Sequence, residues 1–135
     1  ILVSLNKIYT AFITKINTIT PQIPTVYENK KYDPLIGVDY QEVFILPSSN
    51  NVPYINETSY EMEGLVQITL CYGYDEGRSK AMDRANLYMG LFPVGTVLTI
   101  DSLKIRIKGV PQITNLGVDN GRYKIALRVG FICML

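Results

Sequence analysis

Residues 64–93 read GLVQITLCYGYDEGRSKAMDRANLYMGLFP, and this stretch decides the fold because it predicts a strand, a loop and a helix in direct succession. Its first part extends to about residues 63–73 and is the most hydrophobic strand-like run of the chain, which favours a central position in a sheet. In its second part an apolar stripe follows helical spacing and ends at Pro93. The stripe consists of Ala81, Met82, Ala85, Tyr88, Met89 and Phe92.

The loop between strand and helix lacks the features of a phosphate-binding loop. Only Gly73 and Gly77 are available, and neither common glycine spacing for nucleotide binding is present. Asp75 and Glu76 would repel an anion there, whereas carboxylates at a helix start stabilise the helix dipole. We therefore interpret this segment as scaffold.

The segments before it predict one helix and two strands. Apolar residues from Leu2 to Ile19 recur at steps of three and four, and Thr20-Pro21 should end this helix. Strands are expected at about residues 24–29 and at 41–47, the second stopped by Pro47, with a turn at Asp33-Pro34 between them. Residues 47–61 are rich in Pro, Asn and Ser, which indicates a long loop.

The last third is all strand. Leu103, Ile105 and Ile107 alternate with basic residues, and a similar alternation runs through residues 122–131. Asn120-Gly121 suits a tight hairpin that pairs about 111–118 with 122–133. The predicted order is helix, two or three strands, helix, three strands. That order predicts an α+β fold, a mainly antiparallel β-sheet with two helices packed on one face, in a single domain over residues 1–135.

Composition excludes several classes of function. The 135 residues include no histidine and carry a net charge of +1, so His-based catalysis, His metal sites and dominant binding to nucleic acid or membranes are not expected. Cys71 and Cys133 lie in apolar runs and are predicted to be buried free thiols. The apolar start of the chain is too often interrupted by polar residues to span a membrane, and it lacks the marks of a signal peptide. No catalytic residue, metal or cofactor is predicted.

Charge is divided unevenly along the chain. Residues 1–76 contain four basic and nine acidic side chains, whereas residues 77–135 contain nine basic and three acidic ones. If the two segments present different surfaces, one subunit could meet the next head to tail, and such a contact can close into a ring. The alternative is that both charge sets only keep a sheet solvated.

Four segments resemble one family in their order and spacing: VYENKKYDP (26–34), YQEVFILP (40–47), the run at 63–96, and NGRYKIALRVGF (120–131). The family is that of the bacteriophage tail terminators related to minor tail protein U, also described as a phage domain of unknown function. Its shared features fall on Tyr27, Asn29, Tyr32, Pro34, Leu46, Pro47, Gly64, Gln67, Ile68, Glu76, Gly77, Leu91, Phe92, Gly95 and Tyr123.

The resemblance implies a structural virion protein rather than an enzyme. Proteins of this family form a ring, usually of six subunits, at the head-proximal end of the tail tube, after assembly in the host cytoplasm. The ring ends tube polymerisation and joins the tube to the head-side connector, and DNA passes through its lumen without sequence-specific binding. The expected partners are therefore further copies of the chain, the tube protein and the head-completion or connector protein. The alternatives are another head–tail joining component, such as an adaptor, or a tube subunit.

Two sets of residues are the candidate interaction sites. For ring closure we expect a basic strand face to meet acidic side chains of a neighbour, although the same basic face could instead line the lumen. The basic set is Lys104, Arg106, Lys108, Arg122, Lys124 and Arg128, and the acidic set is Glu57, Glu61 and Glu63. The docking loop for the tube or connector is expected at Ser48, Ser49, Asn50, Asn51, Val52, Pro53, Tyr54, Ile55 and Asn56.

Overall fold

The computed structural model describes residues 5–19, 23–27, 39–51, 61–73, 79–101, 103–119 and 121–134. Over these residues the chain forms two helices and a seven-stranded sheet. In chain order the elements are α1 (Leu5–Ile16), β1 (Thr25–Tyr27), β2 (Tyr40–Asn51), β3 (Glu61–Gly73), α2 (Ser79–Leu91), β4 (Val97–Ile100), β5 (Leu103–Ile107), β6 (Gln112–Asp119) and β7 (Arg122–Met134).

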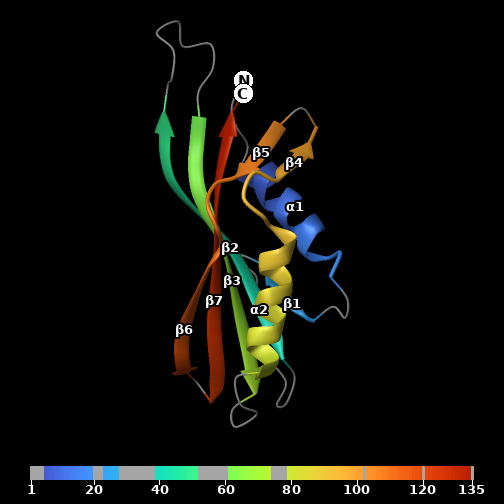
Figure 1. Ribbon diagram of the computed structural model, residues 1–135, viewed down its shortest axis with the longest axis vertical. Coiled ribbons are helices and arrows are strands. Elements are labelled where there is room, and N and C mark those ends of the chain that lie inside the picture. Colours follow the sequence, from blue (N-terminus) through green and yellow to red (C-terminus); the bar gives the residue numbers. More distant parts are fainter. Residues whose placement is uncertain are drawn as a thin grey trace, which may run out of the picture.

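The strands lie side by side in the order β1-β2-β3-β7-β5-β4, and β6 also pairs with β7 (Figure 1). Only β1 runs parallel to its neighbour, while the other described pairs are antiparallel. The predicted α+β fold is therefore confirmed, and β3 is central as expected, with β2 on one side and β7 on the other.

Strand β7 shares one edge between two partners. Its end pairs with β5, from Phe131 to Met134, and its first half pairs with β6, from Arg122 to Arg128. The chain changes from one partner to the other at Gly130, where the Lys108 amide donates to the Gly130 carbonyl at 2.9 Å. A side chain is excluded at Gly130, because an added Cβ would lie 2.9 Å from the Lys108 carbonyl oxygen.

Both helices pack on the same face of the sheet, which we call the covered face (Figure 1). Phe12 of α1 is fully buried there, with its ring centroid 5.5 Å from that of Phe92 and 5.7 Å from that of Phe131. Because side chains alternate along strands, the covered face takes every second residue. These residues make up the core, including Val43, Ile45, Val66, Ile68, Leu70, Ile125, Leu127 and Val129.

A buried polar chain crosses the covered face from α2 to β1. Arg84 Nε donates to the Tyr88 hydroxyl at 3.0 Å, and that hydroxyl donates to Gln41 Oε1 at 2.5 Å. Gln41 Nε2 in turn donates to Thr25 Oγ1 at 2.8 Å. Since Arg84 is only 5 % exposed, this helix buries a cation that its apolar stripe did not reveal. The network fastens the three-residue edge strand β1 to the centre of the fold.

The structure corrects the prediction that Pro47 ends the second strand. Strand β2 continues to Asn51, and its register with β3 shifts between Pro47 and Ser49. Proline lacks the amide hydrogen that a regular ladder requires, so it is tolerated on an open strand edge or at a bulge. Among the described residues both conditions hold, because β1 pairs with β2 only as far as Val43 and the register with β3 shifts at Pro47.

Other boundaries also differ. Helix α1 ends at Ile16, before Thr20-Pro21, and a turn follows in which the Thr18 hydroxyl donates to the Lys15 carbonyl. Strand β4 was not predicted, since four residues are too few for a clear alternation. It joins β5 through a turn in which Asp101 has a φ of 52°, a conformation that aspartate tolerates better than most residues. The predicted turn at Asp33-Pro34 lies outside the described residues.

Candidate interaction surfaces

The face of the sheet opposite the helices carries the basic residues that the sequence singled out. We call it the open face and define it by the residues that alternate with the core, among them Phe44, Gln67, Thr69 and Ala126. In β7 its cations are Arg122, Lys124 and Arg128, and in β5 they are Lys104 and Arg106. Arg106 pairs with Ile132 and Lys104 with Met134, so the β5 cations continue the same surface.

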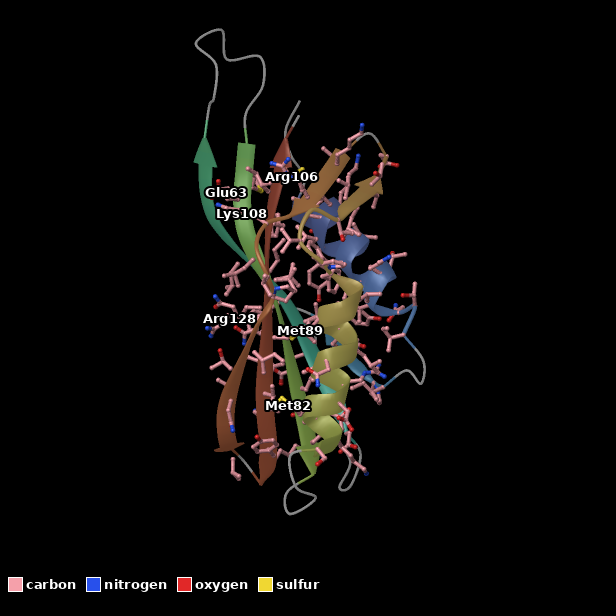
Figure 2. The ribbon with its side chains drawn as sticks, viewed as in Figure 1. Glu63, Met82, Met89, Arg106, Lys108 and Arg128 are labelled. Atoms are coloured by element: carbon pink, nitrogen blue, oxygen red, sulfur yellow. The ribbon has the colours of Figure 1, made fainter. Side chains whose placement is uncertain are left out.

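Lys108 follows β5 and reaches the open face through an ion pair. Its Nζ lies 2.9 Å from Glu63 Oε2 of the same chain, and both side chains lie on the side of the sheet away from the helices (Figure 2). One carboxylate expected to contact a neighbouring subunit is thus bound within its own. Glu61 lies at the start of β3, and Glu57 is outside the described residues.

Arg128 is held in a fixed orientation by its neighbour on β3. Its Nε donates to Gln67 Oε1 at 3.0 Å, and Gln67 Nε2 donates to Thr69 Oγ1 at 3.0 Å. Gln67 and Thr69 are 8 % and 4 % exposed, although no described helix lies over them. In the sequence, the only signal for this hydrogen bond was a glutamine within an otherwise apolar strand. The role of Gln67 in orienting Arg128 was not predicted.

A second arginine of the open face is placed by an aromatic ring. The Arg122 guanidinium carbon lies 4.9 Å from the centre of the Tyr40 ring. Burial raises the pKa of Tyr40 to about 12, and the neighbouring Cys71 adds to that rise. Burial likewise raises the pKa of the Cys71 thiol to about 11. Beneath its charged side chains the open face is therefore poorly hydrated, and Cys71 is not a reactive thiol.

The two cysteines are free and buried, as predicted. Cys71 belongs to the open face and Cys133 to the core of the covered face, so the two thiols are separated by the sheet. Burial raises the pKa of Cys133 as well.

The predicted docking loop is partly strand. Ser48, Ser49, Asn50 and Asn51 belong to β2 and continue its pairing with β3 up to Glu61, which corrects the expected loop boundary of residue 47. Val52, Pro53, Tyr54, Ile55 and Asn56 lie outside the described residues, so their role stays a prediction.

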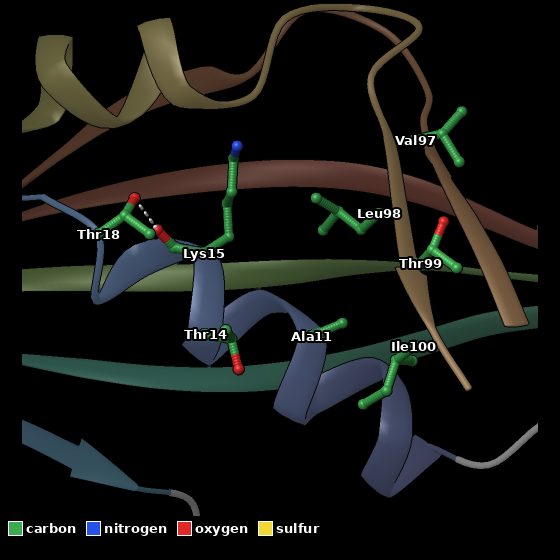
Figure 3. Close-up of a pocket in the computed structure, with 8 residues that line it drawn as sticks. All are labelled: Ala11, Thr14, Lys15, Thr18, Val97, Leu98, Thr99 and Ile100. Carbon is green, nitrogen blue, oxygen red and sulfur yellow. Dashed lines mark hydrogen bonds between the residues drawn. The ribbon is translucent and has the colours of Figure 1, made fainter.

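A pocket of about 330 Å³ lies between α1 and the edge strand β4 (Figure 3). Ala11 and Leu98 form its buried floor, and Thr14, Lys15 and Thr18 line the helix side. Val97 is 50 % exposed at its strand side, and Val94, three positions before it in the chain, is 57 % exposed. The lining is mainly aliphatic and hydroxyl-bearing, without a nucleophile paired to a base, so the pocket suits contact rather than chemistry.

The described residues contain no group of three or more Cys, Asp or Glu side chains that could hold a metal ion. Neither helix of the described part is long and apolar enough to cross a membrane.

Comparison with known proteins identifies the family. The family described as phage tail terminator protein matches residues 7–131. A comparison with curated proteins gives no match. One solved structure, whose name carries no functional description, superposes with a TM-score of 0.78 at 18 % identity and covers 98 % of this chain and 96 % of its own, a likeness of fold. The match over residues 7–131 shows that the chain belongs to the phage tail terminator family, a family of structural tail proteins.

Proposed function

We propose that this protein forms a closed ring that caps the phage tail tube, ends its polymerisation and joins it to the head-side connector. The observation that carries the proposal is the family match over residues 7–131. The ring, of six subunits by the family's pattern, belongs at the head-proximal end of the tail.

The architecture suits a part that stops polymerisation. A terminator must match the growing tube on one side and offer no copy of that surface on the other. Three adjacent strands of this sheet, β2, β3 and β7, are 12 to 13 residues long, so they form a rigid plate. Its two faces differ in chemistry, since one is apolar beneath two helices and the other is lined with cations.

The ring contact that we propose joins two different apolar patches, one from each of two neighbouring subunits. One is the rim of the α1–β4 pocket, with Val97 exposed, and the other is β6, with Leu116 44 % and Val118 56 % exposed. Strands β4 and β6 lie toward opposite ends of the long axis (Figure 1). Unlike patches on opposite sides of one subunit are what a head-to-tail contact requires. The ring contact expected from the sequence, the basic face against a neighbour's carboxylates, stays a prediction.

Light scattering on the purified protein tests ring formation. The expected result is one closed oligomer with a fixed mass at all concentrations, either alone or after addition of tube ends. A protein that grows into long polymers would be a tube subunit, and a protein that binds tubes without stopping their growth would be an adaptor. A tube-length assay separates those outcomes from termination.

Two substitutions test the head-to-tail contact. Val97→Asp and Leu116→Asp place a charge on opposite partners of the proposed contact, at positions exposed enough to leave the fold intact. Each variant alone should fail to form rings. A mixture of the two should form dimers and no larger species, because each chain keeps one intact patch. Rings formed by either variant alone would contradict this contact.

The tube-docking role of residues 52–56 is tested by replacing them with a Gly-Ser segment of equal length. This change spares Ser49–Asn51, which the structure places in β2. We expect the variant to form rings that no longer fix tube length, and normal tube lengths would contradict the docking role.

A further inference from the structure

Leu116 lies outside the regular register of the sheet. In the ladder between β6 and β7, Asn115 pairs with Ile125. Gly117 pairs with Lys124, the next residue along β7, so Leu116 is an extra residue between two consecutive pairs. Such a bulge re-aims a side chain and is a built feature of a strand rather than a defect. The bulge leaves the Leu116 side chain 44 % exposed.

The side chain of Asn115 holds the bulge in its shape. Its Oδ1 accepts a hydrogen bond from the Gly117 amide at 2.7 Å, and its Nδ2 donates to the Tyr123 hydroxyl at 2.9 Å. Gly117 has a φ of 75°, a conformation that glycine adopts without steric cost. Tyr123 packs in turn against the core. The backbone that carries Leu116 is therefore fixed before any partner arrives, which lowers the entropy lost on contact.

The pocket between α1 and β4 has the chemistry to receive an aliphatic side chain. At its floor, Ala11 and Leu98 are each 8 % exposed. On its helix wall the Thr14 hydroxyl donates to the carbonyl four residues earlier at 2.8 Å, and the Thr18 hydroxyl donates to the Lys15 carbonyl at 2.6 Å (Figure 3). Because both hydroxyls are already bonded, an apolar group can fill this space of about 330 Å³ without leaving either of them unsatisfied.

A second copy of the chain is the partner that brings these two features together. Strand β6 and the α1–β4 pocket lie toward opposite ends of the long axis, so Leu116 does not reach the pocket of its own subunit (Figure 1). A protruding side chain and a pocket at separate places on one chain join copies head to tail. Two other exposed leucines are less suited, since Leu46 pairs in register with Leu65 and Leu87 lies within α2.

We infer that Leu116 is the anchor of the ring contact, that its side chain enters the α1–β4 pocket of the neighbouring subunit, and that Asn115 positions it. The inference rests on the proposed ring and names the residues that specify its head-to-tail contact. Affinity at interfaces is concentrated in a few side chains that fill well-packed pockets, while their neighbours mainly exclude water. In this contact Leu116 touches Ala11, and the exposed Val97 and Val118 surround them.

The concentration at which subunits assemble tests the anchor. It is measured by light scattering under the conditions in which the unaltered protein forms its ring. We expect Leu116→Ala to raise the midpoint concentration at least about tenfold. The matched control Leu87→Ala shortens a similarly exposed leucine, 49 % exposed on α2, and should change the midpoint less than about twofold. An unchanged midpoint for Leu116→Ala would overturn the inference.

An exchange of side-chain sizes tests whether Leu116 and the pocket touch. Ala11→Leu fills the pocket from its floor and should weaken assembly as Leu116→Ala does. A chain with both substitutions should recover to within about threefold of the unaltered protein, because contacting residues are energetically coupled. If circular dichroism shows that Ala11→Leu does not fold, Thr14→Leu fills the same pocket from an exposed position of α1. Losses that simply multiply in the double variant would show that the two places do not meet.

The positioning role of Asn115 is tested in two backgrounds. Asn115→Ala should raise the midpoint concentration in the otherwise unaltered chain. In a chain that already carries Leu116→Ala it should change the midpoint less than about twofold, because Asn115 acts through the Leu116 side chain. The same loss in both backgrounds would mean that Asn115 only stabilises β6, which contradicts the positioning role.

Failure of this inference and failure of the proposed ring give different results. Rings of Leu116→Ala at the unaltered midpoint would overturn the inference alone and leave the capping function standing. If the unaltered protein forms no closed oligomer, with or without tube ends, both are wrong. If Ala11→Leu forms normal rings that no longer fix tube length, the pocket receives a segment of the tube protein instead of a second copy, and the inference is wrong.

Discussion

The residues on the two faces of the sheet are buried in different ways. On the covered face, helices α1 and α2 exclude water and the side chains interdigitate as an apolar core. On the open face, Gln67, Thr69 and Ala126 are as buried as core residues although no described helix lies over them, and Gln67 accepts a hydrogen bond from Arg128. The difference teaches that strand residues can be buried without a described helix over them, and that the stems of long charged neighbours can contribute to such burial.

The largest effect should come from the covered face. Phe12→Ala removes a ring that contacts two others in the core, so it should lower the free energy of unfolding by about 3–5 kcal/mol. Urea unfolding measures the change. The matched truncation Phe44→Ala on the open face, where the ring is half-buried, should cost only about 1 kcal/mol. Equal losses from the two truncations would show that the two faces contribute equally to stability.

The buried polar chain should give the next largest effect. Tyr88→Phe leaves Gln41 and Arg84 without their shared hydroxyl, which should cost about 1–3 kcal/mol because both groups are buried. Tyr123→Phe is the control, since its hydroxyl accepts an exposed hydrogen bond from Asn115 and its loss should change stability by less than about 0.5 kcal/mol. If both variants unfold at the same urea concentration, the network does not fasten β1 to α2.

The dependence of stability on alkaline pH tests the burial of Cys71 and Tyr40 on the open face. The folded protein raises the pKa of Cys71 to about 11 and that of Tyr40 to about 12, from ordinary values of 9.0 and 10.0. Folding therefore favours the protonated forms, so their contribution to stability is complete below pH 9 and is lost as pH rises from about 9 to about 12. Unfolding measured at a series of pH values should show this decline, and Cys71→Ala should remove its lower part.

Thiol labelling tests the burial of the two cysteines directly. At pH 8 a disulfide reagent should modify neither Cys71 nor Cys133 in the folded protein, and both should react after unfolding in urea. Reaction of Cys71 at the rate of an exposed thiol would show that water reaches the base of the open face.

The smallest effect is expected for the ion pair between Lys108 and Glu63. Their side chains are 57 % and 24 % exposed, so a double-mutant cycle with Lys108→Ala and Glu63→Ala should give a coupling energy of about 0–1 kcal/mol. A coupling energy above about 2 kcal/mol would mean that this part of the open face excludes water as the covered face does.

Features with a strong local signal were predictable from the sequence. Asn120-Gly121 fixed the hairpin of β6 and β7, and Gly121 has the positive φ of 72° that such a turn needs. The apolar stripe predicted α2, and Pro93 ended it as expected. The run at residues 63–73 was correctly identified as the central strand.

Features that depend on distant partners were not predictable. Pro47 lies in β2 where no described strand pairs with the outer edge and where the register with β3 shifts, which the local sequence does not show. The burial of Arg84 depends on Tyr88 and on Gln41, 43 positions away, as the tertiary fold brings β2 under α2. The basic residues were predicted from alternation, but the brace of Arg128 required the register of β3 with β7.

Strand β7 also dictates when this protein can finish folding. It is the partner of β3, β5 and β6, yet all three precede it in the chain. None of the three can complete its ladder until the ribosome has made the segment that joins them. We therefore expect the sheet to be completed in a single event once residues 122–134 have been made, so that chains lacking this segment present no finished surface to a waiting tube.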